Sequence, residues 1–275
     1  MTSASVTAIT LSVAHVPDEI PSDPETRART VFIVVDVIRA TTTLAVMFER
    51  GARRVYVARN VDAARAAHVS LPDTLLAGEI AAVAPPDFDH GNSPEEWGHL
   101  DVAGRDILFS TTNGARALHA SSGGGPILAG SLRNATAVSA AALEAAAALG
   151  FNARVLVVCS GRSDLPAVDD SLCAAWLRIT LRAVAAQVGI PVALDEAAHA
   201  AVAPLDEMGA SRWSRAEATD WLSEQLTASP PARDVLDVGL GADIAWCAAL
   251  DNSREIPTVT GYDAESDLLT VEGGK

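Results

Sequence analysis

A short run of β-branched and aromatic residues, 31–35, runs directly into a charged and hydroxyl-rich stretch, 36–43. The run is too short for a helix, and its composition is typical of a buried strand. Asp36 ends it, Arg39 follows, and three threonines at 41–43 lead into a helical pattern over 44–50. A carboxylate, a guanidinium and a helix N-terminus therefore meet at the carboxyl end of one strand. In an open α/β sheet, ligands bind at that edge.

Strand-like and helix-like segments alternate from residue 31 to residue 188. Such alternation predicts a parallel sheet with helices on both faces. The rest of the chain is mainly helical, and residues 257–272 predict two terminal strands. We therefore expect an α/β fold of three layers, α/β/α, with a largely parallel sheet, a helical C-terminal part and a terminal β-hairpin. Further strands are expected at 9–14, 53–58, 74–77, 106–109, 127–129 and 154–158.

The length of 275 residues fits one large α/β domain. We therefore predict a single α/β domain over residues 1–275, with residues 1–8 disordered. Residues 190–275 are an alternative small C-terminal subdomain. Hydrophobic residues make up 49% of the chain but aromatic residues only 4%, so Ala, Val and Leu must fill most of the core. The Ala-rich helices have smooth faces suited to self-packing, so the sequence allows a homodimer as well as a monomer.

The net charge of −15 argues against nucleic acid and anionic membranes as partners. No apolar stretch approaches the length of a membrane span, and the first residues lack a signal-peptide pattern. The three cysteines form no CxxC pair, which fits reduced thiols and a cytoplasmic protein. Cys159 is read as a small buried apolar side chain. An anionic substrate would need a locally positive pocket, and the acidic chain favours a bound divalent cation.

Two further strands are followed by polar clusters, at 110–116 and at 160–170. The carboxyl ends of parallel strands share one edge, so we expect these clusters to converge with Asp36. Glu79, after another strand, and the loop at 91–94 can reach the same edge. Oxygen ligands, arginines and backbone amides gathered in this way suit Mg²⁺ and a phosphate-like anion.

Several other kinds of site are excluded by their missing motifs. The chain has no GxxxxGK[ST], no GxGxxG after a strand, and no HExxH or HxH. Leu165 stands where a cysteine phosphatase would carry its phosphate-binding arginine, and Asp36 lacks the second aspartate of haloacid dehalogenase-type phosphatases.

Simpler structural explanations stay open for individual residues. Asp36 and the threonines after it can serve as helix caps. Arg39 and Arg116 can form surface ion pairs, and Asn113 with the glycine after it is as typical of a turn as of a backbone nest that binds an anion. Asp243 is read as a helix cap.

Several stretches in the same order resemble one known family. They are 36–43 with 51–52, 77–79, 88–94, 111–118, 130–131 with Asn134, and 159–161 with Asp170 and 173–174. On these residues the chain resembles the 2-phosphosulfolactate phosphatases, over about 30–175 and again near 239–247. The resemblance implies a three-layer α/β fold and Mg²⁺-dependent hydrolysis of a phosphorylated, sulfonated three-carbon acid of coenzyme M synthesis. It also makes Asp170 a site residue.

The chain departs from the family pattern at four places. Ser160 replaces a usual Ala, Asp169 a usual Glu and Ala115 a usual Thr. Pro230 and Pro231 lie where a His-Gly pair is expected.

The resulting hypothesis is Mg²⁺-dependent hydrolysis of a small phosphorylated acid, with 2-phospho-3-sulfolactate as the substrate that the resemblance implies. The predicted metal ligands are Asp36, Glu79 and Asp170. The predicted catalytic residues are Asp36, Arg39, Glu79, Arg116 and Asp170. The predicted substrate-binding residues are Thr41, Thr42, Asn92, Ser93, Thr111, Thr112, Asn113, Gly114 and Arg162.

Three alternatives remain. The chain can be a phosphatase of another small phosphorylated acid, or a non-catalytic anion-binding protein on the same fold. Within the phosphatase hypothesis, direct attack by water stands beside a covalent aspartyl-phosphate on Asp36.

Overall fold

The computed structural model describes residues 8–274, without the side chains of residues 197, 198 and 200–203. Residues 1–7, most of the segment predicted to be disordered, lie outside the described residues, whereas Ala8 is placed directly before the first strand.

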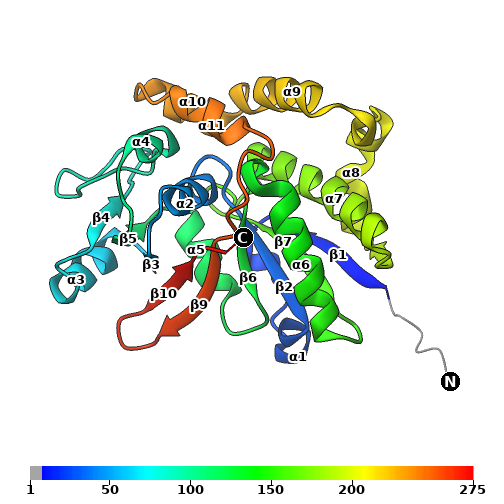
Figure 1. The fold of residues 1–275 in the computed structure, drawn as a ribbon, viewed down its shortest axis with the longest axis horizontal. Helices are drawn as coiled ribbons and strands as arrows, with labels where there is room; N and C mark the ends of the chain where they lie inside the picture. Colours follow the sequence, from blue (N-terminus) through cyan, green and yellow to red (C-terminus); the bar gives the residue numbers. More distant parts are fainter. Residues whose placement is uncertain (1–7, 275) are drawn as a thin grey trace.

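The strands form one ten-stranded sheet in the order β4-β5-β3-β10-β9-β6-β2-β7-β1-β8 (Figure 1). Their bounds are β1 Ile9–Ala14, β2 Thr30–Val35, β3 Arg54–Ala58, β4 Leu75–Gly78, β5 Asp106–Ser110, β6 Ile127–Gly130, β7 Arg154–Cys159, β8 Val192–Leu194, β9 Thr258–Asp263 and β10 Leu268–Glu272. The α/β fold with a largely parallel sheet and a C-terminal hairpin is confirmed. The short edge strand β8 was not predicted.

The helices occupy both sides of the sheet and the C-terminal part of the chain. Their bounds are α1 Pro24–Ala28, α2 Ala40–Glu49, α3 Val61–Ser70, α4 Pro94–His99, α5 Gly114–Ser121, α6 Ala135–Leu149, α7 Val168–Val188, α8 Glu196–Glu207, α9 Arg215–Thr227, α10 Pro230–Asp237 and α11 Ala242–Ala248. The sequence predicts that α5 begins at Ala117 and α7 at about Ser171. Both helices begin three residues earlier, because their first turns lie within the polar clusters.

Strand β2 lies at the centre of the hydrophobic core and is buried on both faces. Val31, Ile33 and Val35 pack in the core that includes residues of α6 and α7. Phe32 and Val34 point the other way, into the core formed with α2 and α5. This two-sided burial explains the continuous apolar run in the sequence.

The terminal hairpin lies inside the sheet rather than at its edge. Strand β10 pairs antiparallel with β3 and with β9, and a bulge interrupts the β9 pairing between Thr270 and Val271. Strand β9 meets β6 through the single pair Leu128 and Thr258. The hairpin therefore separates two parallel sets, β8-β1-β7-β2-β6 and β3-β5-β4 (Figure 1). Each set is parallel within itself, as the largely parallel sheet predicts, whereas the position of the hairpin between the two sets was not predicted.

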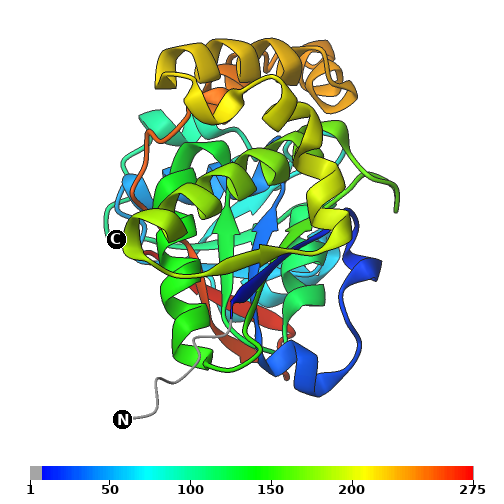
Figure 2. The same cartoon turned by 90° about the vertical axis from the view of Figure 1, so that its right-hand side faces the viewer.

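The C-terminal helices lie across the edge at which β2 and β6 end (Figure 2). Leu222 of α9, Ala232 of α10 and Ile244 of α11 belong to the same hydrophobic core as α6 and α7. Because this core is continuous, α10 is held over the strand ends and can contribute to a site there.

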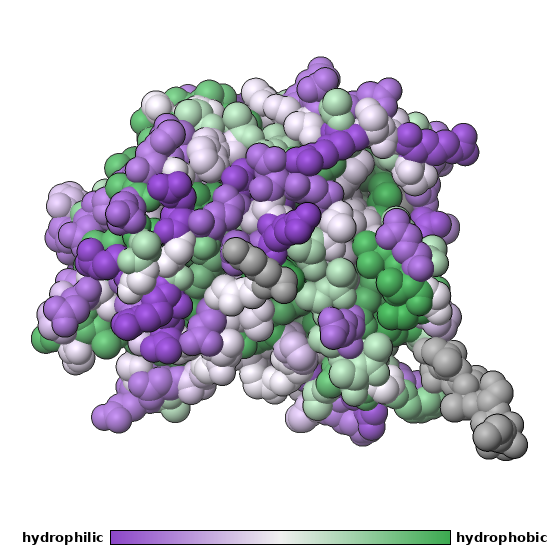
Figure 3. Space-filling model, viewed as in Figure 1, coloured by the Kyte–Doolittle hydropathy of each residue, from purple (hydrophilic) through white to green (hydrophobic). Residues whose placement is uncertain are grey.

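The surface in the view of Figure 3 is mostly hydrophilic, with a hydrophobic patch beside the C-terminal end of α7 (Figure 3). Within residues 8–274, no helix has the length and apolar character needed to span a bilayer. The three cysteines are free and buried. Cys159 packs in the hydrophobic core, where burial raises the pKa of its thiol, as the reading of this residue as a small apolar group predicts.

Candidate active site

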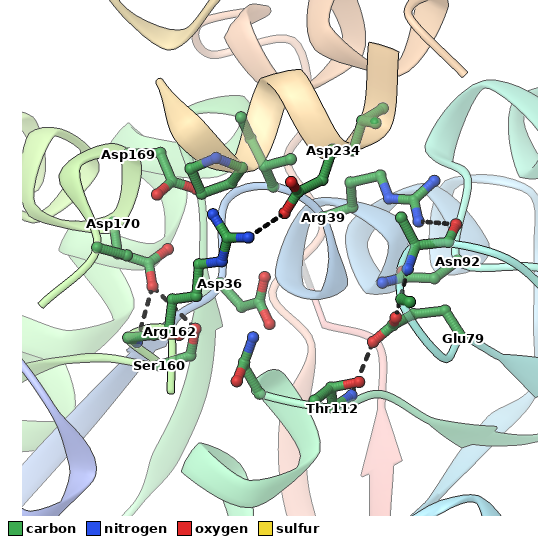
Figure 4. Close-up of a pocket in the computed structure, with 18 of the residues that line it drawn as sticks. Asp36, Arg39, Glu79, Asn92, Thr112, Ser160, Arg162, Asp169, Asp170 and Asp234 are labelled. Carbon is green, nitrogen blue, oxygen red and sulfur yellow. Dashed lines mark hydrogen bonds and ion pairs between the residues drawn. The ribbon is translucent and has the colours of Figure 1, made fainter. Parts of the chain in front are cut away.

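A cavity of about 550 Å³ opens where strands of both parallel sets end (Figure 4). Asp36 follows β2, Glu79 follows β4, Thr112 follows β5 and Ser160 follows β7, and all four line the cavity. The predicted convergence of the polar clusters is therefore confirmed, although the hairpin divides the sheet between them.

Asp36 is buried at the bottom of this arrangement, with 7% of the residue exposed. Its Oδ1 accepts a hydrogen bond of 3.3 Å from the backbone N–H of Ala40, in the first turn of α2. A Cβ atom on Gly114 would lie 2.8 Å from Asp36 Oδ2 and 2.6 Å from the Cβ of Ala40. Glycine is therefore required at this position, because α5 begins in contact with the carboxylate.

Glu79 and Asp170 are held by backbone amides on either side of Asp36. Glu79 accepts from Thr112 N at 2.7 Å and from Ala82 N at 3.0 Å. Asp170 accepts from Val37 N at 3.0 Å and, through its other oxygen, from Ser160 Oγ at 2.8 Å. These bonds fix the orientation of both carboxylates and tie together the loops that follow four different strands.

Asp169 lines the cavity although it was not among the predicted site residues. It is 2% exposed, and its Oδ1 is buried without a hydrogen-bond partner among the described residues. An acid at a helix start is common for reasons of the helix dipole alone, so its position in α7 gave no signal of a site. A buried carboxylate oxygen without a donor indicates that this position is suited to a cation.

Three acids of the cavity, Asp36, Asp169 and Asp170, have raised pKa values. Burial, followed by the charges of Asp170 and Glu79, raises the pKa of Asp36 to about 7. Burial, followed by the charge of Asp36, raises the pKa of Asp169 to about 7 as well. Burial and the neighbouring Asp169 also raise the pKa of Asp170. The cavity therefore favours a counter-charge for these carboxylates at neutral pH.

The metal-free protein should lose stability as the pH rises from 5.5 to 8. A carboxyl group whose folded-state pKa lies above its unfolded value stabilises the fold while it is protonated, and this contribution is lost as the pH rises through the folded-state pKa. With the pKa of Asp36 raised from 3.8 to about 7, the loss from this residue is about 2 kcal/mol over that interval.

The measurement is urea unfolding in EDTA at both pH values. The variant Asp36→Asn serves as the control, because every other group titrates in both proteins. Equal pH dependence in the two proteins would contradict the assignment to Asp36.

Arg39 lies in the wall of the cavity and is fixed on both sides. It donates to Asp243 Oδ2 at 2.7 Å and to the carbonyl oxygen of Ala82 at 2.6 Å. Asp243 also accepts from Ser93 Oγ at 2.5 Å and from Glu95 N at 3.2 Å. The reading of Asp243 as a helix cap is wrong, because its carboxylate joins α11 to Arg39 and to the start of α4.

The C-terminal helices contribute a second set of residues that sequence reasoning missed. Pro231, Asp234 and Asp237 of α10 line the cavity, and Asp234 forms an ion pair of 2.6 Å with Arg162 (Figure 4). Of the two prolines that replace the expected His-Gly pair, Pro231 therefore stands at the site itself.

The remaining predicted residues divide into two groups. Asn92, Thr112, Asn113 and Arg162 line the cavity, whereas Thr41, Thr42, Ser93, Thr111 and Arg116 do not.

The residues of the second group have structural partners. Thr41 and Thr42 donate to the carbonyl oxygens of Asp36 and Val37. Ser93 caps α4, and Thr111 Oγ1 accepts from Ala115 N at the start of α5. Their hydroxyls hold turns in place, so the hydroxyl-rich sequence reflects local capping as well as a site.

Arg116 was expected to face the same anion as Arg39. It pairs instead with Asp164, in the turn after β7. Arg116 does not line the cavity, and its half-exposed ion pair with Asp164 matches the surface-pair alternative given for it above.

The donor set fits the magnesium ion that the family resemblance implies, provided that the ion keeps water ligands. No three His, Cys, Asp or Glu side chains of the described chain form a ready metal-binding group. Mg²⁺ is commonly held by one or two carboxylates, with water and substrate phosphate completing its coordination. Asp36 and the unpartnered oxygen of Asp169 supply such carboxylates. The predicted ligand set of Asp36, Glu79 and Asp170 stays a prediction.

Comparisons with known proteins match the chain to one family. The chain matches the family model described as 2-phosphosulpholactate phosphatase over residues 14–261. It is 32% identical over 253 residues to a probable 2-phosphosulfolactate phosphatase of Deinococcus radiodurans, covering 91% of this chain and 97% of that protein. It is 35% identical over 237 residues to a protein of the same name from Thermus thermophilus, covering 86% and 90% respectively. A third protein of that name, from Gloeobacter violaceus, is 33% identical over 261 residues.

Proposed function

The chain belongs to the 2-phosphosulpholactate phosphatase family, and we propose that it hydrolyses 2-phospho-3-sulfolactate to 3-sulfolactate and phosphate. It is thus a phosphoric monoester hydrolase acting on the phosphate ester of a small anionic hydroxy acid. The observation that carries the proposal is the cavity in which four buried acids, Asp36, Glu79, Asp169 and Asp170, meet two arginines. A cytoplasmic location and a role in coenzyme M synthesis belong to the same proposal.

The acids of the cavity require a cation before they can accept a phosphate ester. We assign Asp36 and Asp169 as the carboxylates that would hold Mg²⁺. When bound, this ion supplies Lewis-acid polarisation of a phosphoryl oxygen. Glu79 and Asp170 orient the surrounding loops through their hydrogen bonds to backbone amides.

The start of α5 is the natural position for the phosphoryl group. Thr112 and Asn113 line the cavity directly before this helix, and Gly114 brings its first turn against Asp36. Backbone N–H groups at a helix N-terminus bind phosphate oxygens. Arg39, held rigidly by Asp243, adds a positive charge in the same wall, where it stabilises the charge that develops during the reaction.

Phosphate release should depend on Mg²⁺ and should be fastest with a substrate that carries a second acidic group. We expect EDTA to lower the rate by about 10²-fold or more, and added Mg²⁺ to restore it. The measurement is phosphate release from 2-phospho-3-sulfolactate, 2-phospholactate and p-nitrophenyl phosphate. A higher kcat/KM for another phosphorylated acid would assign a different substrate. Absence of release from every substrate, with binding retained, would favour the non-catalytic anion-binding protein.

A further inference from the structure

The two arginines of the cavity differ in their freedom to meet a ligand. Among the described residues that line it, the cations are Arg39 and Arg162. The side chain of Arg39 is 2% exposed and is held by Asp243 and by a backbone carbonyl. The side chain of Arg162 is 45% exposed, and its ion-pair partner Asp234 is 48% exposed. Arg162 is therefore the cation that can change partners without breaking a buried pair.

The backbone of Arg162 is fixed while its side chain reaches across the cavity. Arg162 and Leu165 exchange backbone hydrogen bonds of 2.8 and 3.0 Å. Gly161, with φ +67°, allows this turn, since a Cβ atom there would lie 2.7 Å from the carbonyl oxygen of Leu165. The guanidinium meets Asp234 of α10 on the opposite wall (Figure 4). The pair thus connects the turn after β7 to the C-terminal helices.

We propose that Asp234 takes the place of the second acidic group of the substrate on Arg162, and that this group displaces Asp234 when the substrate binds. The proposal rests on the proposed function, because it concerns the part of the substrate that is not phosphate. A guanidinium presents a planar fork of donors that matches either a carboxylate or a sulfonate. Asp234 is then a residue that determines specificity through Arg162 and touches no reacting atom.

The exchange sets how strongly the cavity prefers a substrate with a second acidic group. In the free protein, Asp234 neutralises Arg162 beside Asp36, Asp169 and Asp170. A phosphate ester without a second acidic group cannot form an ion pair with Arg162, so the pair of Arg162 and Asp234 stays intact. A phosphorylated acid gains the Arg162 contact only after displacing Asp234, so the strength of this pair sets the apparent affinity for such acids.

The test is the variant Asp234→Asn, which keeps the shape of the side chain and removes its charge. We expect KM for 2-phospholactate to fall about two- to fivefold, the range that a half-exposed ion pair contributes. KM for isopropyl phosphate, which lacks the carboxylate, should stay unchanged. The matched control is Asp237→Asn, on the same helix and lining the same cavity, which should change both KM values by the same factor.

Measurements in the variant Arg162→Ala distinguish displacement of Asp234 by the substrate from a structural role of α10. In Arg162→Ala, the further change Asp234→Asn should have no effect on either KM. If Asp234→Asn instead raises KM for both esters equally, the pair only holds α10 in place and the proposal is overturned. An unchanged KM for 2-phospholactate would overturn it as well.

Binding provides a readout that does not depend on catalysis. Calorimetric titration with 3-sulfolactate, which carries no phosphate, should show about two- to fivefold tighter binding to Asp234→Asn than to the wild type. If wild type releases no phosphate from any ester, the proposed function fails whatever this titration gives. If wild type is active but 3-sulfolactate binds the variant and the wild type equally, only the inference about Asp234 fails.

Discussion

Replacing Asp36 by asparagine should lower kcat for phosphate release by about 10³-fold or more. The amide has nearly the shape of the carboxylate but lacks the negative oxygen that would hold a cation at the centre of the cavity. The fold should survive, because burial and neighbouring acids already raise the pKa of Asp36 to about 7. Loss of this charge removes a repulsion, so the metal-free variant should unfold at a higher temperature than the wild type at pH 8.

The measurement combines kcat at saturating substrate and Mg²⁺ with the unfolding temperature in EDTA. Asp237→Asn is the matched control, because it removes one charge from the outer wall of the same cavity. A kcat within tenfold of the wild-type value would show that Asp36 is not central to the reaction. Equal losses in the two variants would show that the total charge of the cavity matters more than the position of Asp36.

The position of Asp36 could be predicted because every signal for it is local. An apolar run defines β2, a charge ends the run, and the helix that follows begins within a few residues. The same reasoning placed Glu79, Thr112 and Arg162 in the cavity, since each comes shortly after a strand. Strand ends are features of short stretches of sequence, and those that precede the cavity residues lie within about one residue of their predicted positions.

Asp169 and Arg116 show where local reasoning stops. Both lie in the polar clusters, yet only Asp169 faces the cavity, while Arg116 meets Asp164. An acid in the first turn of a helix is favoured with or without a ligand, and an arginine after a turn can pair with any acid within reach. The choice between these outcomes depends on which side of the helix packs against the sheet, and side-chain types alone do not determine it.

The position of the hairpin depends on contacts still further apart in the chain. Two strands at the C-terminus were predictable from their own residues, but their insertion between β3 and β6 was not. Pairing partners such as Leu268 and Ala58 are distant in sequence. Every strand edge offers the same backbone N–H and C=O groups, so these groups do not determine which two strands pair. Because the hairpin divides the parallel strands, the arrangement of the cavity walls follows from this non-local choice.

Replacing Asp243 by alanine should destabilise the protein by about 3–5 kcal/mol, because it leaves the buried guanidinium of Arg39 without its carboxylate. For a chain of this size, the unfolding temperature should fall by roughly 10 °C. The same change removes the acceptor of Ser93 Oγ and of Glu95 N, so α11 also loses its polar contact with α4. Thermal and urea unfolding in EDTA measure the effect independently of any bound ion.

The double variant Arg39→Met with Asp243→Leu separates the cost of an unpaired charge from the value of the pair. If the unpaired guanidinium causes the loss, the double variant should recover most of the stability that Asp243→Ala loses. It should still be a poor phosphatase, since the positive charge of the cavity wall is absent. A double variant as unstable as Asp243→Ala would instead assign the stability to the hydrogen bonds that Asp243 makes with Ser93 and Glu95. Arg39 and Asp243 are 204 positions apart, so their pairing links the turn between β2 and α2 to helix α11, and the wall of the cavity depends on both.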